Sequence, residues 1–290
     1  MRPAKARGIF PVVNTAIMVI IILICLFPIL YILCRSVSSG AAIANGKVFL
    51  LPVGFNMESY KGILAQPGFL RSYANTLLYT AVGTVFTLAV TALCAYPLSK
   101  TALLGRKFFM AMFIGTMFFS GGLIPSFVLI THLKMTDTIW ALVVPAAFNQ
   151  FYIILAMGAI QGLPGDLEES AALDGLNPWQ ILIWIIIPLC VPVFATIALF
   201  TALGIWNDWF TPMIYITSNQ KQPVMLVLKN IITGGSITTG NFTGGGPNAN
   251  INSSSLKSAA IVVVMLPITA IYPFVQRFFT KGMLIGSIKG

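Results

Sequence analysis

Residues 163–189 read LPGDLEESAALDGLNPWQILIWIIIPL. The first part of this stretch predicts a short helix, because Pro164 suits the first position of a helix, where its missing N–H costs nothing. Three acids fall in the first turns, where a carboxylate suits the positive end of the helix dipole: Asp166, Glu168 and Glu169. Gly175 can adopt the left-handed conformation that ends a helix. The stretch therefore predicts a helix of about two turns followed by a sharp break.

A second helix is expected directly after the break. Asn177 can cap it, with Pro178 at its first position and Gln180 three residues after the cap, which is the spacing of a capping box. In the first helix, the small residues Ser170, Ala171 and Ala172 predict a thin surface that another protein could approach closely.

This arrangement resembles the signature of ABC importer permeases, which is Glu-Ala-Ala, three residues, Gly, nine residues, and Ile-x-Leu-Pro. Here it reads Glu169-Ser170-Ala171, Gly175 and Ile185-Ile186-Ile187-Pro188, with Ser170 and Ile187 as mild departures. The flanking apolar runs, Trp206-Asn207-Asp208 and the tail 281–290 are similar to the sugar-importing, maltose-type branch. The tail and the long loop 207–257 look closest to the subgroup that handles large or acidic plant oligosaccharides.

The resemblance implies one permease subunit of a type I importer for carbohydrate, with an oligosaccharide as the expected substrate, in the inner membrane of a bacterium. Such a subunit pairs with a second permease subunit and two ATPase subunits, and an extracytoplasmic solute-binding protein delivers the substrate. ATP and magnesium are then bound by the ATPase subunits, and this chain holds no catalytic residue, metal or cofactor. The residues expected to couple to the ATPase are Glu169, Ser170, Ala171, Asp174, Gly175, Leu176, Trp179 and Pro188, with Ser287, Lys289 and Gly290 as a tail contact.

The composition by itself indicates a membrane protein. Of 290 residues, 57% are hydrophobic and 8% charged, against about 25% charged in a soluble domain. The net charge of +10 is too thinly spread for nucleic acid and favours anionic membrane lipid. The four cysteines show no metal-ligand spacing.

Six apolar runs are each long enough to cross a bilayer, which takes about 20 residues: 12–33, 73–98, 108–130, 139–160, 181–205 and 259–279. The first is too long for a signal peptide, whose apolar region is roughly 7–15 residues. We therefore expect an all-α fold, with one transmembrane domain over 1–290 and six membrane helices. The loops 35–72 and 207–257 would lie outside.

Six spans place both termini on one side, and the distribution of Lys and Arg in short loops makes that side the cytoplasm. The loop 161–180 is then cytoplasmic as well, although it carries four acids and no Lys or Arg. A loop that lacks the usual topology signal is expected to dock a partner, which here would be the ATPase.

The sequence offers little catalytic chemistry. Residues 40–47 resemble a phosphate-binding loop, but the spacing is one residue too long, and Val48 stands where Ser or Thr must hold magnesium. The predicted spans contain almost no ionisable residues, which argues against a proton-driven secondary carrier and a membrane enzyme. A secondary carrier and a permease for a non-sugar solute remain as alternatives, whereas a non-transporting scaffold would leave the signature unexplained.

Neutral polar residues mark a candidate substrate path. Asn149 and Gln150 fall in the fourth run beside Tyr152, and a buried unpaired amide costs roughly 2–7 kcal/mol, so these amides should face the path or another helix. Trp206, Asn207 and Asp208 end the fifth run, either as interfacial anchors or as sugar contacts. Five threonines form one helical stripe, for which we favour helix packing over pore lining: Thr76, Thr80, Thr84, Thr87 and Thr91.

Overall fold

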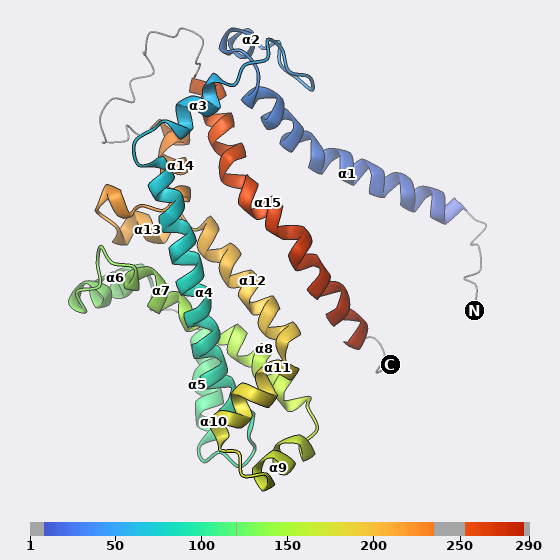
Figure 1. Cartoon of the computed structure of the whole chain (residues 1–290), viewed down its shortest axis with the longest axis vertical. Helices are drawn as coiled ribbons and strands as arrows, with labels where there is room; N and C mark the ends of the chain where they lie inside the picture. Colours follow the sequence, from blue (N-terminus) through green and yellow to red (C-terminus); the bar gives the residue numbers. More distant parts are fainter. Residues whose placement is uncertain (1–8, 120, 235–252, 287–290) are drawn as a thin grey trace. The chain divides into compact units, whose positions relative to one another are not determined.

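The computed structural model describes residues 9–119, 121–234 and 253–286, and within these ranges the chain is all-α, as predicted (Figure 1). It divides into two compact units. One comprises Met1–Phe69 with Asn230–Leu266, and the other comprises Leu70–Lys229 with Pro267–Gly290. The two units are described separately below.

The first unit begins with α1 (Ile9–Ser36), which contains the predicted run 12–33. None of its apolar window is buried by the rest of the chain, and Ile22, for example, is 58% exposed. A helix that is apolar on every side suits lipid rather than water. The unit also holds α2 (Gly40–Ala44), α3 (Glu58–Leu64) and the first part of α15 (Ser253–Gly286).

Hydroxyl groups fold the segment after α1 back on itself. Ser36 and Tyr60 share a hydrogen bond of 2.6 Å between their hydroxyls, which joins the end of α1 to α3. Ser38 donates to the carbonyl of Cys34 (2.6 Å) and accepts from the N–H of Val53 (3.1 Å). The predicted outer loop 35–72 is thus a folded segment with two short helices of its own.

The second unit is built on α4 (Phe69–Ser99), a helix of 31 residues that contains the predicted run 73–98. Its other elements are α5 (Arg106–Phe118), α6 (Leu123–His132), α7 (Trp140–Ala147), α8 (Gln150–Gln161), α9 (Asp166–Leu173), α10 (Pro178–Ile181), a π-helix (Leu182–Ile186), α11 (Ile187–Leu189), α12 (Val191–Asn207), α13 (Phe210–Tyr215), a 3₁₀ turn (Asn219–Lys221) and α14 (Val224–Thr233), which crosses into the first unit. A core of buried residues from α4, α5, α8, α9, α10 and α12 holds it together, and Ala95, Ala156 and Ile197 are completely buried in it.

Three of the six predicted runs are bent pairs of helices. The angles are 115° between α5 and α6, 47° between α7 and α8, and 82° between the helical segment Pro178–Leu189 and α12. Three other helices are long and apolar enough to cross a membrane alone, so there are up to six spans among the described residues if each bent pair counts as one.

The bend before α12 follows from two prolines. Pro188 and Pro192 have no N–H to donate, so the regular ladder is interrupted on both sides of Cys190. The N–H of Ile187 instead bonds five residues back to Leu182, which gives the π-helix. The run 181–205 is therefore two helical pieces joined at Cys190.

At the end where α4 begins, Asp137 joins two connecting segments. Its Oδ1 accepts from the N–H groups of Thr217 (3.1 Å) and Ser218 (2.9 Å), and Nζ of Lys221 donates to its Oδ2 (2.8 Å). The segment around Lys221 is also fixed to α4, because Tyr79 donates to the carbonyl of Lys221 (2.8 Å). The hydrogen bond from Lys221 holds the pKa of Asp137 below its usual value.

We expect Asp137→Asn to lower the melting temperature of the purified protein at pH 7 by a few degrees. A carboxylate whose pKa is lowered by folding stabilises the fold above its unfolded pKa of about 3.9, and this contribution is lost as the pH falls through the lower folded value. The difference from wild type should therefore shrink at pH 3.5. Asp174→Asn, at an exposed helix end, is the control. An undiminished difference at pH 3.5 would contradict the assignment.

Candidate functional site

The residues of the signature form a helix, a turn and a second helix. Helix α9 begins at Asp166 rather than at Pro164, because a tighter turn comes first, in which Leu167 N–H donates to the carbonyl of Pro164 (3.3 Å). Gly175 has φ +83°, the left-handed conformation predicted for it. Leu176 N–H donates to the carbonyl of Ala171, and Gly175 N–H to that of Ala172, both at 3.1 Å. These two bonds form a Schellman cap.

The second helix has the predicted capping box. The N–H of Gln180 donates to Oδ1 of Asn177 (3.0 Å), and the N–H of Asn177 donates to Oε1 of Gln180 (2.9 Å). Pro178 occupies the first helical position. Both ends of the turn are therefore fixed by local hydrogen bonds, which makes the loop a rigid element.

The exposure of the loop differs from the expectation at one position. Ala171 is only 5% exposed and belongs to the core of the chain, so it cannot form the outer contact surface predicted for Ser170, Ala171 and Ala172. Helical geometry turns every third or fourth residue of α9 toward the body, and Ala171 lies on that inner side. Leu173, at 89% exposed, and Trp179, at 63%, face outward instead.

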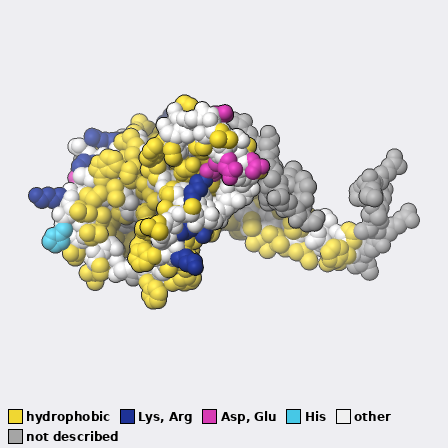
Figure 2. Space-filling view, turned by 90° about the horizontal axis from the view of Figure 1, so that it is seen from below, with side chains coloured by type: hydrophobic (Ala, Val, Ile, Leu, Met, Phe, Trp, Pro, Cys, Tyr) yellow, Lys and Arg dark blue, Asp and Glu magenta, His cyan; other side chains and the backbone are white. Residues whose placement is uncertain are grey.

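The other predicted coupling residues divide in the same way. Leu176 packs against the core, whereas the remaining ones are exposed: Glu169, Ser170, Asp174, Gly175 and Pro188. Figure 2, which views the end of the molecule where α9 lies, shows acidic side chains gathered beside apolar surface. The loop thus offers acidic and apolar groups together.

An ion pair joins α9 to the end of α4. Lys100 pairs with Glu168, and the Lys100 ammonium lies 4.4 Å from the centre of the Tyr96 ring. Gln161 at the end of α8 donates to the carbonyl of Ser99 (3.2 Å). The ion pair could not be predicted from the sequence, because Lys100 and Glu168 are 68 positions apart. They place the segments around 100 and 161–168 at one end of the unit.

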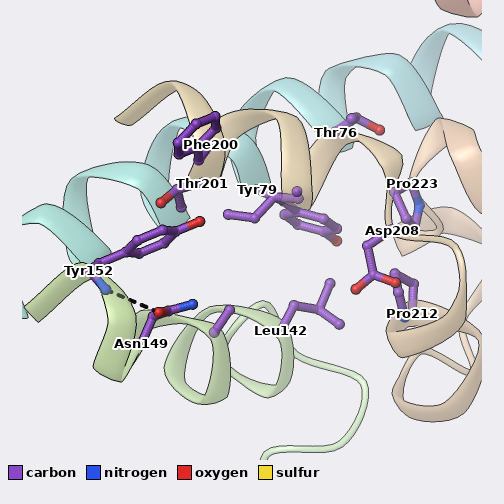
Figure 3. Close-up of a pocket in the computed structure, with 13 residues that line it drawn as sticks. Thr76, Tyr79, Leu142, Asn149, Tyr152, Phe200, Thr201, Asp208, Pro212 and Pro223 are labelled. Carbon is purple, nitrogen blue, oxygen red and sulfur yellow. Dashed lines mark hydrogen bonds between the residues drawn. The ribbon is translucent and has the colours of Figure 1, made fainter. Parts of the chain in front are cut away.

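The second unit also holds a cavity of about 230 Å³ (Figure 3). Elements from four parts of the unit meet there: α4, α7 with α8, α12, and the segment that follows α12. The lining residues are Thr76, Tyr79, Leu142, Ala146, Asn149, Tyr152, Phe200, Thr201, Gly204, Ile205, Asp208, Pro212 and Pro223. Three of the six predicted path residues, Asn149, Tyr152 and Asp208, are among them.

The break between α7 and α8 puts Asn149 at the cavity. Its Oδ1 accepts from the N–H of Tyr152 (3.2 Å), so Asn149 is the cap of α8 and not an uncompensated residue in mid-helix. A broken helix whose N-terminus lies beside a cavity is how many membrane transporters build a binding site. Tyr152, in the first turn of α8, lines the same cavity.

The other three predicted path residues do not line the cavity. Trp206 is 5% exposed and packs edge-on against Tyr73, with ring centres 6.1 Å apart. Asn207 is exposed, and its amide donates to the carbonyl of Leu203 in its own helix (2.8 Å). Gln150 is the first residue of α8 and is absent from the lining. The sequence Trp206-Asn207-Asp208 does not by itself reveal which of the three side chains faces the cavity.

The threonine stripe of α4 divides between the two interpretations that the sequence left open. Thr76 lines the cavity and accepts from the N–H of Val224 (2.7 Å). Thr87 and Thr91 are fully buried, in keeping with helix packing.

The tail residues Ser287, Lys289 and Gly290 lie outside the described residues. No group of three potential metal ligands occurs among the described residues.

Two proteins of Bacillus subtilis (strain 168) are similar to this chain over nearly its whole length. No protein-family model matches the chain. Protein LplC of Bacillus subtilis (strain 168) is 40% identical over 100% of the chain and 98% of that protein. The polygalacturonan/rhamnogalacturonan transport system permease protein YtcP of the same strain is 35% identical, covering 92% of the chain and 94% of that protein.

A solved structure shows the same fold. It is the crystal structure of a bacterial ABC transporter involved in the import of the acidic polysaccharide alginate, with a TM-score of 0.89 and 36% identity over 95% of this chain and 98% of that one. The sequence identity is high over nearly the full length of the chain, and Gly175 and Asn177 have the expected geometry. Together these findings establish the family of this chain. The chain belongs to the carbohydrate ABC transporter permeases, multi-pass subunits of the bacterial inner membrane.

Proposed function

We propose that this permease forms half of the translocation path of an ATP-driven oligosaccharide importer and is coupled to separate ATPase subunits through α9. The observation that carries the proposal is the rigid, exposed turn formed by α9, Gly175 and α10, with Leu173 and Trp179 facing outward. Two large exposed apolar side chains on a capped turn, beside four acids, are the kind of surface that a partner covers.

The contacts within the second unit suggest how docking could reach the path. The Lys100–Glu168 pair ties α9 to the end of α4. Further along α4, Thr76 and Tyr79 line the cavity. A displacement of α9 by an ATPase subunit that keeps this pair intact would therefore move α4, and with it two residues of the cavity lining. ATP acts here as a ligand that favours one of two states.

The remaining partners complete the proposal. Two ATPase subunits would bind ATP and magnesium and hydrolyse the nucleotide, with no catalytic residue in this chain. A second permease subunit would form the other half of the path, and a solute-binding protein would deliver substrate from outside. The tail residues Ser287, Lys289 and Gly290 are proposed as a further ATPase contact.

Both termini and α9 are proposed to lie in the cytoplasm. The second and fourth connecting segments lie together at one end, because Gln161 contacts Ser99. The third and fifth also lie together, because Lys221 contacts Asp137. This grouping agrees with alternate crossings, and the short basic segments favour the cytoplasm for the end that holds α9.

The substrate class is proposed from the relatives. One is named for polygalacturonan and rhamnogalacturonan transport, and the solved transporter is involved in alginate import. An oligosaccharide derived from such a polymer is the best-supported substrate. A non-sugar solute and a secondary carrier are less well supported, the carrier because the predicted spans have few ionisable residues.

Co-purification tests the subunit assignment. The tagged chain, expressed with its candidate ATPase and second permease, should elute from a detergent extract as a complex containing all three. A chain that folds and is extracted intact but elutes without either protein would refute the proposal.

A further inference from the structure

We infer that the cavity beside Asn149 and Asp208 is a saccharide subsite that takes the uncharged, hydroxyl-bearing face of a sugar ring and disfavours a carboxylate. The inference rests on the proposed sugar transport and adds to it the charge of the unit bound here. At about 230 Å³, the cavity is smaller than the roughly 300–1,000 Å³ of common ligand pockets. It therefore suits a single unit of a chain.

Two lining groups have hydrogen-bonding capacity left for a ligand. Asn149 uses only its Oδ1 as the cap of α8, so its amide N–H₂ is left to donate. Figure 3 shows the hydroxyl of Tyr152 directed into the cavity, next to Asn149. A hydroxyl-rich ligand supplies both donors and acceptors for such groups.

Apolar side chains form the rest of the lining. The ring of Tyr152 lies near Phe200 on one side of the cavity, and Leu142 and Pro212 lie on the other (Figure 3). A sugar ring has C–H faces between its hydroxyls, and these pack against aromatic and aliphatic surface. The mixture of apolar walls with a few directed polar groups is that of a ligand site and not that of a water-filled gap.

The charge of the lining residues determines whether the cavity favours an uncharged or an acidic part of a sugar. Asp208 bears the sole formal charge among the lining residues, none of which is Lys, Arg or His. Its Oδ1 accepts from the N–H groups of Phe210 and Thr211, both at 3.0 Å. Its Oδ2 makes no hydrogen bond within the described chain, and Figure 3 shows the carboxylate facing the cavity. It can accept from a sugar hydroxyl.

A ligand carboxylate in the same cavity would meet Asp208 with no cation to compensate either charge. The nearby ammonium of Lys221 is held by Asp137, so it is not available to a ligand. Like charges at close range repel. A transported polymer that carries carboxylates would therefore present a hydroxylated face to this cavity and direct its carboxylates elsewhere.

The test compares a galacturonic acid trisaccharide with its full methyl ester, which has the same sugar rings but carries a methyl group in place of the charge on each carboxyl. Binding is measured by titration calorimetry on the assembled complex in nanodiscs, without the solute-binding protein, whose own selectivity then cannot contribute. Asp208→Asn keeps an oxygen that can accept from Phe210 and Thr211 but removes the charge. It should raise the affinity for the acid relative to that for the ester about fivefold or more.

Two further variants keep the result interpretable. Asp174→Asn removes an equal charge at an exposed helix end outside the cavity and should leave the ratio of the two affinities unchanged. Tyr152→Phe keeps the ring but removes the hydroxyl, and should weaken binding of the ester severalfold. An unchanged ratio in Asp208→Asn would overturn the charge assignment, and unaltered ester binding in Tyr152→Phe would overturn the subsite.

The outcomes also separate this inference from the proposed function. A complex that imports sugar but shows either negative result overturns only the inference. A complex that binds neither trisaccharide and imports no sugar overturns both.

Discussion

Leu173→Arg is expected to leave the permease in the membrane and to release the ATPase subunits during purification. Leu173 is 89% exposed at the end of α9, so arginine there costs the permease itself little. In a docked complex the same charge would be buried without a partner, which costs several kcal/mol. A loss of about 2 kcal/mol already weakens binding roughly 30-fold. Co-elution of the ATPase with the tagged permease measures the effect.

Leu104→Arg is the matched control for this prediction. Leu104 is 94% exposed in the segment between α4 and α5, which lies at the same end of the second unit. The substitution introduces the same side chain away from α9, so the ATPase should remain bound. Retention of the ATPase and full uptake by Leu173→Arg would remove α9 from the coupling path.

Ala171→Arg is expected to prevent folding of the permease instead of acting on docking alone. Ala171 is 5% exposed within the core, and its carbonyl accepts the N–H of Leu176 in the cap of α9. A buried arginine without a partner adds both volume and charge, at a cost of several kcal/mol. The amount of monodisperse protein extracted from membranes should fall severely.

The neighbouring Ala172 supplies the control for this second prediction. Ala172 is exposed on the same helix, so Ala172→Arg should be extracted in amounts close to wild type, whatever it does to docking. Equal yields of the two variants would mean that Ala171 is not buried in the folded chain.

The turn after α9 was predictable from the sequence because its geometry is set locally. Gly175 takes the left-handed conformation, and Asn177 and Gln180 bond to each other across three residues. Both features depend on neighbours in the chain and on little else. The inward orientation of Ala171 was not predictable, because it depends on the core against which α9 packs.

The cavity was predictable only in part. Asn149 was found because amides are rare in apolar runs, and Tyr152 because it lies beside that amide in the sequence. Tyr79 and Thr201 are ordinary residues of apolar helices, and only the packing of α4 with α12 brings them together. Trp206 was expected at the path and is buried against Tyr73. The side chains of adjacent residues at a helix end point in different directions, and the sequence alone does not reveal which direction each one takes.

Uptake by proteoliposomes tests the central claim most directly. The complete complex, with its solute-binding protein on the outside and ATP enclosed, should accumulate radiolabelled oligosaccharide against a concentration gradient. Accumulation should stop when ATP is replaced by a non-hydrolysable analogue, and it should persist when ionophores remove all ion gradients. Uptake that needs an ion gradient and proceeds without ATP would contradict the account.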